Sequence, residues 1–150
     1  MQKIVTFLWF DDKAEEAMNF YVSVFKNSKV LNVSRLEGAP NGKVMSGSFQ
    51  LEGQEFMALN GGPQFPFTEA ISFVVNCDSQ DEVDEYWNRL TEGGEEGQCG
   101  WLKDKYGVSW QIVPTVLIEL LNSPDQERAH RVTKVMLKMR KLDIKTLTKA

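Results

Sequence analysis

The sequence predicts an α+β fold of two related halves, each a strand, a helix and a run of strands, followed by a helical tail. Three observations lead to this prediction. Short apolar strands precede two amphipathic helices, the segments after each helix alternate in polarity between turn residues, and the two strand–helix units align without a gap. At 150 residues, 42% of them apolar, the chain can fill one core.

Two helices have the clearest signals. Asp12 is placed to cap a first helix that runs to about Phe25, with Glu15 at its third position. The apolar stripe of this helix is Ala14, Ala17, Met18, Tyr21 and Phe25. Ser79 and Glu82 form a capping box for a second helix, which Gly93-Gly94 ends. The stripe of the second helix is Val83, Tyr86, Trp87 and Leu90.

The two halves match each other over their first elements. The strand Val5–Phe10 falls on Ile71–Asn76, Asp12 falls on Asp78, and the aromatic pair Phe20-Tyr21 falls on Tyr86-Trp87. Any two strand–helix units resemble each other to some degree. The coincidence of strand, cap and aromatic pair nevertheless favours an internal duplication.

Strand-like segments follow each helix. They are Lys29–Leu36, Lys43–Leu51 and Gln54–Asn60 in the first half, and Cys99–Lys103, Val108–Val113 and a short segment near Glu95–Gln98 in the second. Turns are indicated at Ala39–Gly42, at Asp104–Gly107 and at Glu52-Gly53, the last of which is typical of a tight hairpin.

Beyond Pro114 the pattern becomes helical. Thr115–Leu121 forms a short apolar segment, and Ser123 followed by Pro124 signals the start of a longer helix. Its stripe is Val132, Val135, Met136 and Met139, and Asp143 is placed to cap a last turn. This stripe must be buried on its own domain or on a second copy, and we expect a homodimer. The predicted organisation is a single domain with modules at about 1–62 and 68–114 and a tail at 115–150.

The composition excludes several function classes. A net charge of −4, with acids and bases interspersed, gives no electrostatic footprint for nucleic acid or for an anionic membrane. No segment approaches the roughly 20 apolar residues that span a bilayer, and the first apolar run is too short for a signal peptide. Cys77 and Cys99 are expected to be reduced thiols, so the predicted location is cytoplasmic.

Strand alternation separates two faces of the predicted sheet. One parity is bulky and apolar, and we expect it to pack against helices: Val5, Phe7, Trp9, Met57, Leu59, Ile71, Phe73, Val75, Val108, Trp110 and Ile112. The other parity has small, polar and aromatic residues without Lys, Glu or Arg, which is typical of a ligand pocket. The predicted ligand-binding residues on it are Thr6, Leu8, Asn60, Ser72, Ser109 and Gln111. The alternative is a face covered by the other half or by a partner chain.

Several segments resemble a known superfamily. The tandem units, with DDKAEEAMNFYVSVF in the first and GWLKDKYGVSWQIVP closing the second, resemble the vicinal oxygen chelate proteins, which include glyoxalase I, bleomycin-resistance proteins and extradiol dioxygenases. DKYGVSWQIVP and the tail PTVLIELLNSPD are more similar to the PhnB-like branch, whose members are often labelled 3-demethylubiquinone-9 3-methyltransferase. The resemblance covers essentially all of the chain. It implies four βαβββ-type modules per dimer, with each cupped mixed sheet forming a cavity.

The resemblance also implies where metal ligands would lie. Metal-using members take a His from the first strand, a His from the first strand of the second half, a Glu from the last strand and sometimes a carboxylate from the end of the first half. The corresponding residues here are Thr6, Ala70 or Ser72, Gln111, and Ala58 or Asn60. None is an imidazole, thiolate or carboxylate donor, so no metal or other cofactor is predicted. Glu69, beside Ala70, keeps a metal or acid–base option open.

Other candidate chemistries have simpler structural explanations. His130, the one histidine, lies in the tail at a position typical of a solvated helix, and Cys99 has no histidine nearby in the sequence to activate it. The first strand is followed by Asp11-Asp12-Lys13, without the glycine-rich turn of doubly wound methyltransferases. Phe65 and Phe67 either close over a ligand or pack on the core.

The sequence therefore favours a metal-independent, PhnB-like small-molecule binding protein. Amide and hydroxyl groups on an apolar face predict a neutral or mildly polar ligand, whose identity the sequence does not give. One alternative is an enzyme of the superfamily, either lyase, isomerase or dioxygenase-like, or the methyltransferase of the label. The other is a dimeric accessory protein with a vestigial cavity.

Overall fold

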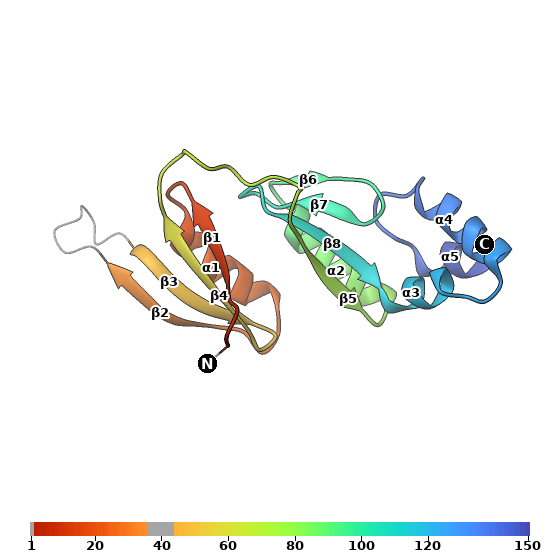
Figure 1. Cartoon of the computed structure of the whole chain (residues 1–150), viewed down its shortest axis with the longest axis horizontal. Coiled ribbons are helices and arrows are strands. Elements are labelled where there is room, and N and C mark those ends of the chain that lie inside the picture. Colours follow the sequence, from red (N-terminus) through yellow and green to blue (C-terminus); the bar gives the residue numbers. More distant parts are fainter. Residues whose placement is uncertain (1, 36–43) are drawn as a thin grey trace. The chain divides into compact units, whose positions relative to one another are not determined.

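The computed structural model describes residues 2–35 and 44–150, with the side chains of positions 44 and 45 excepted. The chain divides into two compact units, Met1–Phe67 and Thr68–Ala150 (Figure 1). Among the described residues no helix is long and apolar enough to cross a membrane. The predicted turn at 39–42 lies outside the described residues.

The first unit is a mixed four-stranded sheet with one helix packed against it. Its elements are β1 (Thr6–Phe10), α1 (Ala14–Val24), β2 (Lys29–Arg35), β3 (Val44–Leu51) and β4 (Gln54–Asn60). The strand order is β1-β4-β3-β2, with β1 parallel to β4 and the other neighbours antiparallel.

The second unit repeats this arrangement and adds the tail. Its elements are β5 (Ser72–Cys77), α2 (Gln80–Thr91), β6 (Glu95–Glu96), β7 (Trp101–Lys103), β8 (Ser109–Pro114), α3 (Thr115–Leu121), α4 (Gln126–Met136) and α5 (Ile144–Lys149). The strand order β5-β8-β7-β6 has the same pattern of parallel and antiparallel neighbours as in the first unit. The prediction of an α+β fold with two tandem βαβββ modules and C-terminal helices is confirmed.

Most of the predicted turns and caps form. Glu52 and Gly53 have φ angles of 48° and 82°, as a tight two-residue hairpin requires. The Ser79 hydroxyl accepts from the Glu82 N–H, and Asp143 accepts from the Thr146 N–H at the start of α5. The predicted cap at Ser123 is wrong, because α4 begins two residues later with Asp125 as its cap.

The predicted cap of α1 at Asp12 is also wrong. The residue before the helix is Lys13, which makes no side-chain cap hydrogen bond. Instead the Ala14 N–H donates to Oδ1 of Asn60 at 2.8 Å, so the end of β4 supplies the acceptor. Asn60 was expected to bind a ligand on the opposite face of the sheet, but in the structure it faces the helix.

The faces of the first sheet are the reverse of the prediction. Leu8, Phe10, Phe56 and Ala58, expected on the pocket face, are buried with α1, while Phe7 is 50% exposed. Tyr21 of α1 stacks on Phe49 at 6.2 Å, and Phe49 stacks on Phe56 at 5.3 Å.

Small residues explain why α1 covers this face. Ala58 pairs across the sheet with Gly47, and a Cβ added to Gly47 would lie 2.8 Å from Cε of Met18. The helix therefore approaches closely where the side chains are small, and the same small residues were interpreted as a pocket in the sequence. Thr6 has the same parity as Leu8, so it lies on the covered side at the start of β1.

The faces of the second sheet are as predicted, except that Ile71, expected to pack against a helix, precedes β5 and is 73% exposed. Trp110 and Ile112 are 3% and 0% exposed and belong to the core that α2 covers, whereas Gln111 between them is half-buried on the other face. Trp110 contacts Phe73 at 5.3 Å between ring centroids, and its indole N–H donates to the buried Asp104 carboxylate at 2.9 Å.

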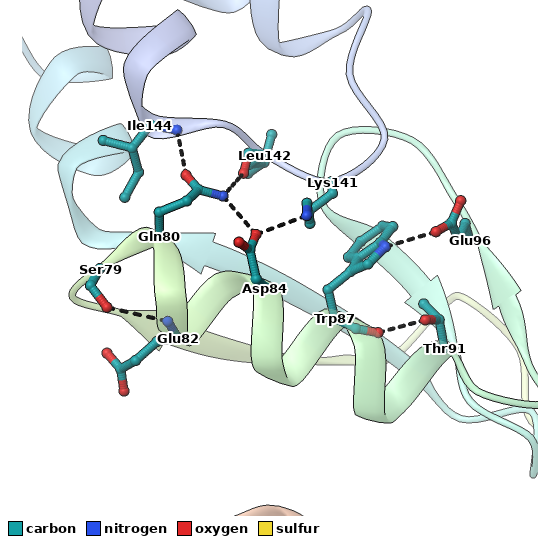
Figure 2. A network of polar contacts seen from close by, with 10 residues as sticks. All are labelled: Ser79, Gln80, Glu82, Asp84, Trp87, Thr91, Glu96, Lys141, Leu142 and Ile144. Carbon is teal, nitrogen blue, oxygen red and sulfur yellow. Dashed lines mark hydrogen bonds and ion pairs between the residues drawn. The ribbon is translucent and has the colours of Figure 1, made fainter.

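The tail forms its own apolar cluster and is attached to α2. The cluster contains Leu117, Leu120, Val132, Leu142 and Leu147, with Met136 and Met139 among the partly buried residues around it. Gln80 of α2 donates to the Leu142 carbonyl and accepts from the Ile144 N–H, as Figure 2 shows. The stripe, which was expected to be buried on its own domain or on a second copy, is thus largely covered within its own unit. The homodimer stays a prediction.

Replacing Trp110 with alanine should lower the free energy of unfolding by about 3–5 kcal/mol, because it removes a buried ring and leaves the Asp104 carboxylate without one donor. Urea denaturation followed by circular dichroism measures this. Gln111→Leu, on the same strand but the opposite face, is the control and should cost about 1 kcal/mol or less. Equal losses for the two variants would contradict the assigned faces.

Asn60→Ala should destabilise the fold by about 1 kcal/mol, because the first turn of α1 loses its acceptor. Asn60→Asp should recover most of this loss, since a carboxylate accepts the same N–H, and the exposed Asn76→Ala serves as control. Thermal denaturation of the three variants measures these changes in stability. An Asn60→Ala protein as stable as the wild type would show that the cap is unimportant.

Candidate functional site

A cavity of about 220 Å³ lies at the β6–β7–β8 side of the second sheet. It is lined by Glu69, Glu95, Glu96, Gly97, Trp101, Leu102, Lys103 and Ser109. All of these residues belong to the second unit, so the cavity is formed within one βαβββ module.

Strand register places the main lining side chains on one face. Lys103 is directly opposite Ser109 in the β7–β8 pair and opposite Glu95 in the β6–β7 pair, and Trp101 is opposite Gln111. Side chains of directly paired residues lie on the same side of an antiparallel sheet. This side is the open face, which α2 does not cover, so the sheet itself forms the floor of the cavity.

The floor contains a buried hydroxyl group that has no partner in the described part of the chain. Ser109 is 1% exposed, and its Oγ has no hydrogen-bond partner among the residues that the structure describes. A buried polar group left unpaired costs about 1–3 kcal/mol. An oxygen or nitrogen atom of a bound molecule would remove that cost, so Ser109 is the best-placed group in the cavity to orient a ligand.

The rim of the cavity carries an ion pair between Lys103 and Glu69. Its side chains are 40% and 56% exposed, so water screens it and its contribution to stability is small. The hydrogen bond with Lys103 holds the pKa of Glu69 below its ordinary value, and the same bond raises the pKa of Lys103, with a further contribution from Glu95. Both partners are therefore charged at neutral pH.

The carboxylate of Glu96 is held by contacts on the α2 side of the sheet, outside the cavity. The Trp87 indole N–H of α2 donates to Oε1 of Glu96 at 2.9 Å, as Figure 2 shows, and Arg140 of the tail lies 3.7 Å from its other oxygen. The Gly100 N–H also donates to the Arg140 carbonyl at 2.8 Å. The tail thus supports the strand edge on which the cavity is built.

Asp84 of α2 anchors the same tail segment. Its Oδ1 accepts from Gln80 and lies 2.8 Å from Nζ of Lys141 (Figure 2). The Lys141 ammonium is the main reason that the pKa of Asp84 is below its ordinary value. The pair is present at neutral pH and is lost only when the pH falls through that lowered pKa.

The structure brings together half of the predicted ligand-binding residues. Ser109 lines the cavity, and Ser72 and Gln111 lie on the same open face, where Nε2 of Gln111 donates to Oγ of Ser72 at 2.9 Å. Thr6, Leu8 and Asn60 belong to the first unit, on the side of its sheet that α1 covers. The expectation that these three residues share an open face with Ser109 is wrong.

The sequence reasoning missed every lining residue of β6 and β7 and the glycine between them, and two of these residues could have been found. Trp101 and Lys103 were placed in a predicted strand, but their alternation was not carried across the Asp104–Gly107 turn to Ser109 and Gln111. Pairing the two strands at that turn would have put all four residues on one face. Glu69, which the sequence analysis considered only as a metal ligand or acid–base group, does line the cavity.

The other candidates are not among the lining residues of this cavity. Phe65 makes an edge contact with Trp9 at 5.0 Å and Phe67 with Phe10 at 5.2 Å, so both rings pack on aromatics of the first unit. His130 is exposed on α4. Burial raises the pKa of the Cys77 thiol to about 12, which makes it unreactive, and Cys99 is a half-buried free cysteine.

The residues of this chain do not fit the metal site of the vicinal oxygen chelate proteins that it resembles. Among the described residues, no three His, Cys, Asp or Glu side chains are grouped so that they could hold a metal ion. Among the positions that correspond to metal ligands in the superfamily, Thr6, Ala58 and Asn60 face α1. Ser72 and Gln111 form a hydrogen bond with each other. Hydroxyl and amide groups in this arrangement are poor ligands for a first-row ion.

Comparisons with known proteins agree with the fold. The sequence model of the 3-demethylubiquinone-9 3-methyltransferase family matches residues 2–113. A PhnB protein from Bacillus cereus is 40% identical, with a TM-score of 0.72, over 76% of this chain and 100% of that chain. The chain matches no curated protein at a significant level.

Two more distant structures share the fold. A protein from Pseudomonas aeruginosa is 22% identical, with a TM-score of 0.63, over 76% of this chain and 98% of that one. The fosfomycin resistance protein FosX from Listeria monocytogenes, in a complex with Mn(II) and sulfate, is 18% identical, with a TM-score of 0.52, over 75% and 91%. The chain therefore belongs to the PhnB-like 3-demethylubiquinone-9 3-methyltransferase family, whose fold is that of the vicinal oxygen chelate proteins.

Proposed function

We propose that this chain is a metal-independent small-molecule binding protein whose ligand occupies the cavity on the open face of the second sheet. The observation that carries the proposal is the Ser109 hydroxyl, which is buried on the floor of the cavity and has no partner among the described residues. In protein interiors nearly all buried polar groups have a hydrogen-bond partner. A ligand site is a place where such a group is left for the ligand to pair with.

The rest of the cavity is compatible with a bound organic molecule. Trp101 provides apolar surface, and Ser109 provides a donor and acceptor at the floor. Pockets for small molecules combine apolar walls with a few placed polar groups in this way. The volume of about 220 Å³ is below the roughly 300–1,000 Å³ typical of drug-sized ligands, which favours a small molecule or one group of a larger one.

The methyltransferase activity in the family description is not the function that this geometry favours. Each sheet has one pair of parallel neighbours and is completed by antiparallel strands, so neither is the doubly wound parallel sheet on which S-adenosylmethionine usually binds. The description names the family and is compatible with a binding function for this member.

The proposal predicts that purified protein carries or takes up a small organic molecule and lacks a stoichiometric transition metal. Native mass spectrometry should show a mass excess over the denatured chain, either at once or after incubation with a metabolite mixture. Elemental analysis should show far less than one Zn, Mn, Ni or Fe per chain. A tightly held ion coordinated from the sheet strands would contradict the metal-independent part.

Ser109→Ala tests the hydroxyl that carries the proposal. Losing it should weaken ligand retention roughly five- to tenfold, which corresponds to about one hydrogen bond, and should leave the melting temperature unchanged or higher. Ser72→Ala is the matched control: its hydroxyl already accepts from Gln111, so its loss should lower stability and leave retention less affected. If Ser109→Ala lowers stability like Ser72→Ala and leaves retention unchanged, the hydroxyl is structural.

A further inference from the structure

The charges around the cavity are unbalanced. Two carboxylates, those of Glu69 and Glu95, line its open face together with one ammonium group, that of Lys103, while the Glu96 carboxylate is turned to the α2 side, where it accepts from Trp87. Lys103 is paired with Glu69, and Arg140 lies 3.7 Å from Glu96. Glu95 is opposite Lys103 across the strand pair and is exposed, so the rim keeps an excess of negative charge after these pairs are counted.

Two further features of the cavity point to a ligand and to its chemistry. The buried Ser109 hydroxyl below the acidic rim is unpartnered among the described residues, which distinguishes this cluster from an ordinary solvated acidic patch. Trp101, beside it, supplies an indole ring, and indole rings attract cations to their faces.

We propose that the cavity binds an organic cation, a small amine or quaternary ammonium compound, whose charged group lies beside Glu95. Its apolar part lies against Trp101, and a polar atom of the ligand reaches Ser109. This inference rests on the proposed function and assigns a ligand class to the same site. It also replaces the neutral ligand that the sequence predicts, because the acidic rim comes from residues which that prediction did not include.

An anionic ligand is the main competitor, since Lys103 could receive it. To do so, Lys103 would have to leave Glu69, and the anion would then lie beside two carboxylates, those of Glu69 and Glu95. A cation meets one like charge, the Lys103 ammonium, but this group is already paired with Glu69, and the Glu95 carboxylate attracts the cation. The field at the rim therefore favours the cation.

The test compares three probes of similar shape that differ in charge: phenethylamine, 2-phenylethanol and 3-phenylpropionate. Each is titrated into the full chain at pH 7, and ¹H–¹⁵N NMR follows the Trp101 indole and the Ser109 amide. Phenethylamine should shift both signals and bind at least roughly threefold more tightly than the alcohol, with the anion weakest. Added salt should weaken the amine selectively.

Glu95→Gln is the informative variant, because the Glu95 side chain makes no hydrogen bond or ion pair with the described residues and its loss leaves the Lys103–Glu69 pair intact. It should weaken phenethylamine binding roughly two- to fivefold, whereas Glu119→Gln, an exposed glutamate on α3, should have no effect. Unchanged affinity in Glu95→Gln would overturn the inference.

The outcomes separate this inference from the proposed function. Tighter binding of the alcohol or of the anion at Trp101 and Ser109 overturns the cationic ligand class and leaves the binding function standing. If none of the three probes shifts these signals, the cationic class is also overturned. The retained-ligand measurement by native mass spectrometry then decides the binding function independently.

Discussion

The buried carboxylate of Asp104 is the constraint on which the second unit depends. It is 3% exposed and accepts from the N–H groups of Tyr106 and Val108 at 2.9 and 3.0 Å and from the Trp110 indole at 2.9 Å. These bonds close the β7–β8 turn and fix the register of β8. Since a slip of one residue would turn every side chain to the other face, Asp104 determines that Trp110 enters the core and that Ser109 lies in the cavity.

The cavity also depends on parts of the chain that do not line it. Glu96 is held by Trp87 of α2, and the tail reaches the same edge through Arg140. Gln80 binds that tail segment to α2 through two backbone contacts. The C-terminal helices, which have no counterpart in the first unit, thus stabilise the module that contains the candidate site.

The sequence predicts much of the fold because strand, helix and cap signals are local. Alternation also gives the faces of β8 correctly, since Trp110 and Ile112 are both bulky and buried. It fails for the first sheet, where bulky Phe7 lies on the open face and Ala58 lies under the helix. The alternation of side chains along a strand shows that the two faces of the sheet differ. Which face a helix covers depends on close packing between helix and sheet, and the sequence of a single strand does not reveal it. The acidic rim was missed for a related reason, because it needs strand pairing and the position of Glu69 in space.

The account can be tested most directly by the free energy of unfolding of Asp104→Asn, measured by urea denaturation together with NMR of the Trp110 indole N–H. The asparagine keeps the shape of the carboxylate but turns an amide N–H toward one of the three donors. We expect a loss of about 2–4 kcal/mol, and an indole proton that exchanges faster with solvent. Stability within about 0.5 kcal/mol of the wild type, with an unchanged indole signal, would contradict the claim that this carboxylate fixes the register of β8 and with it the site.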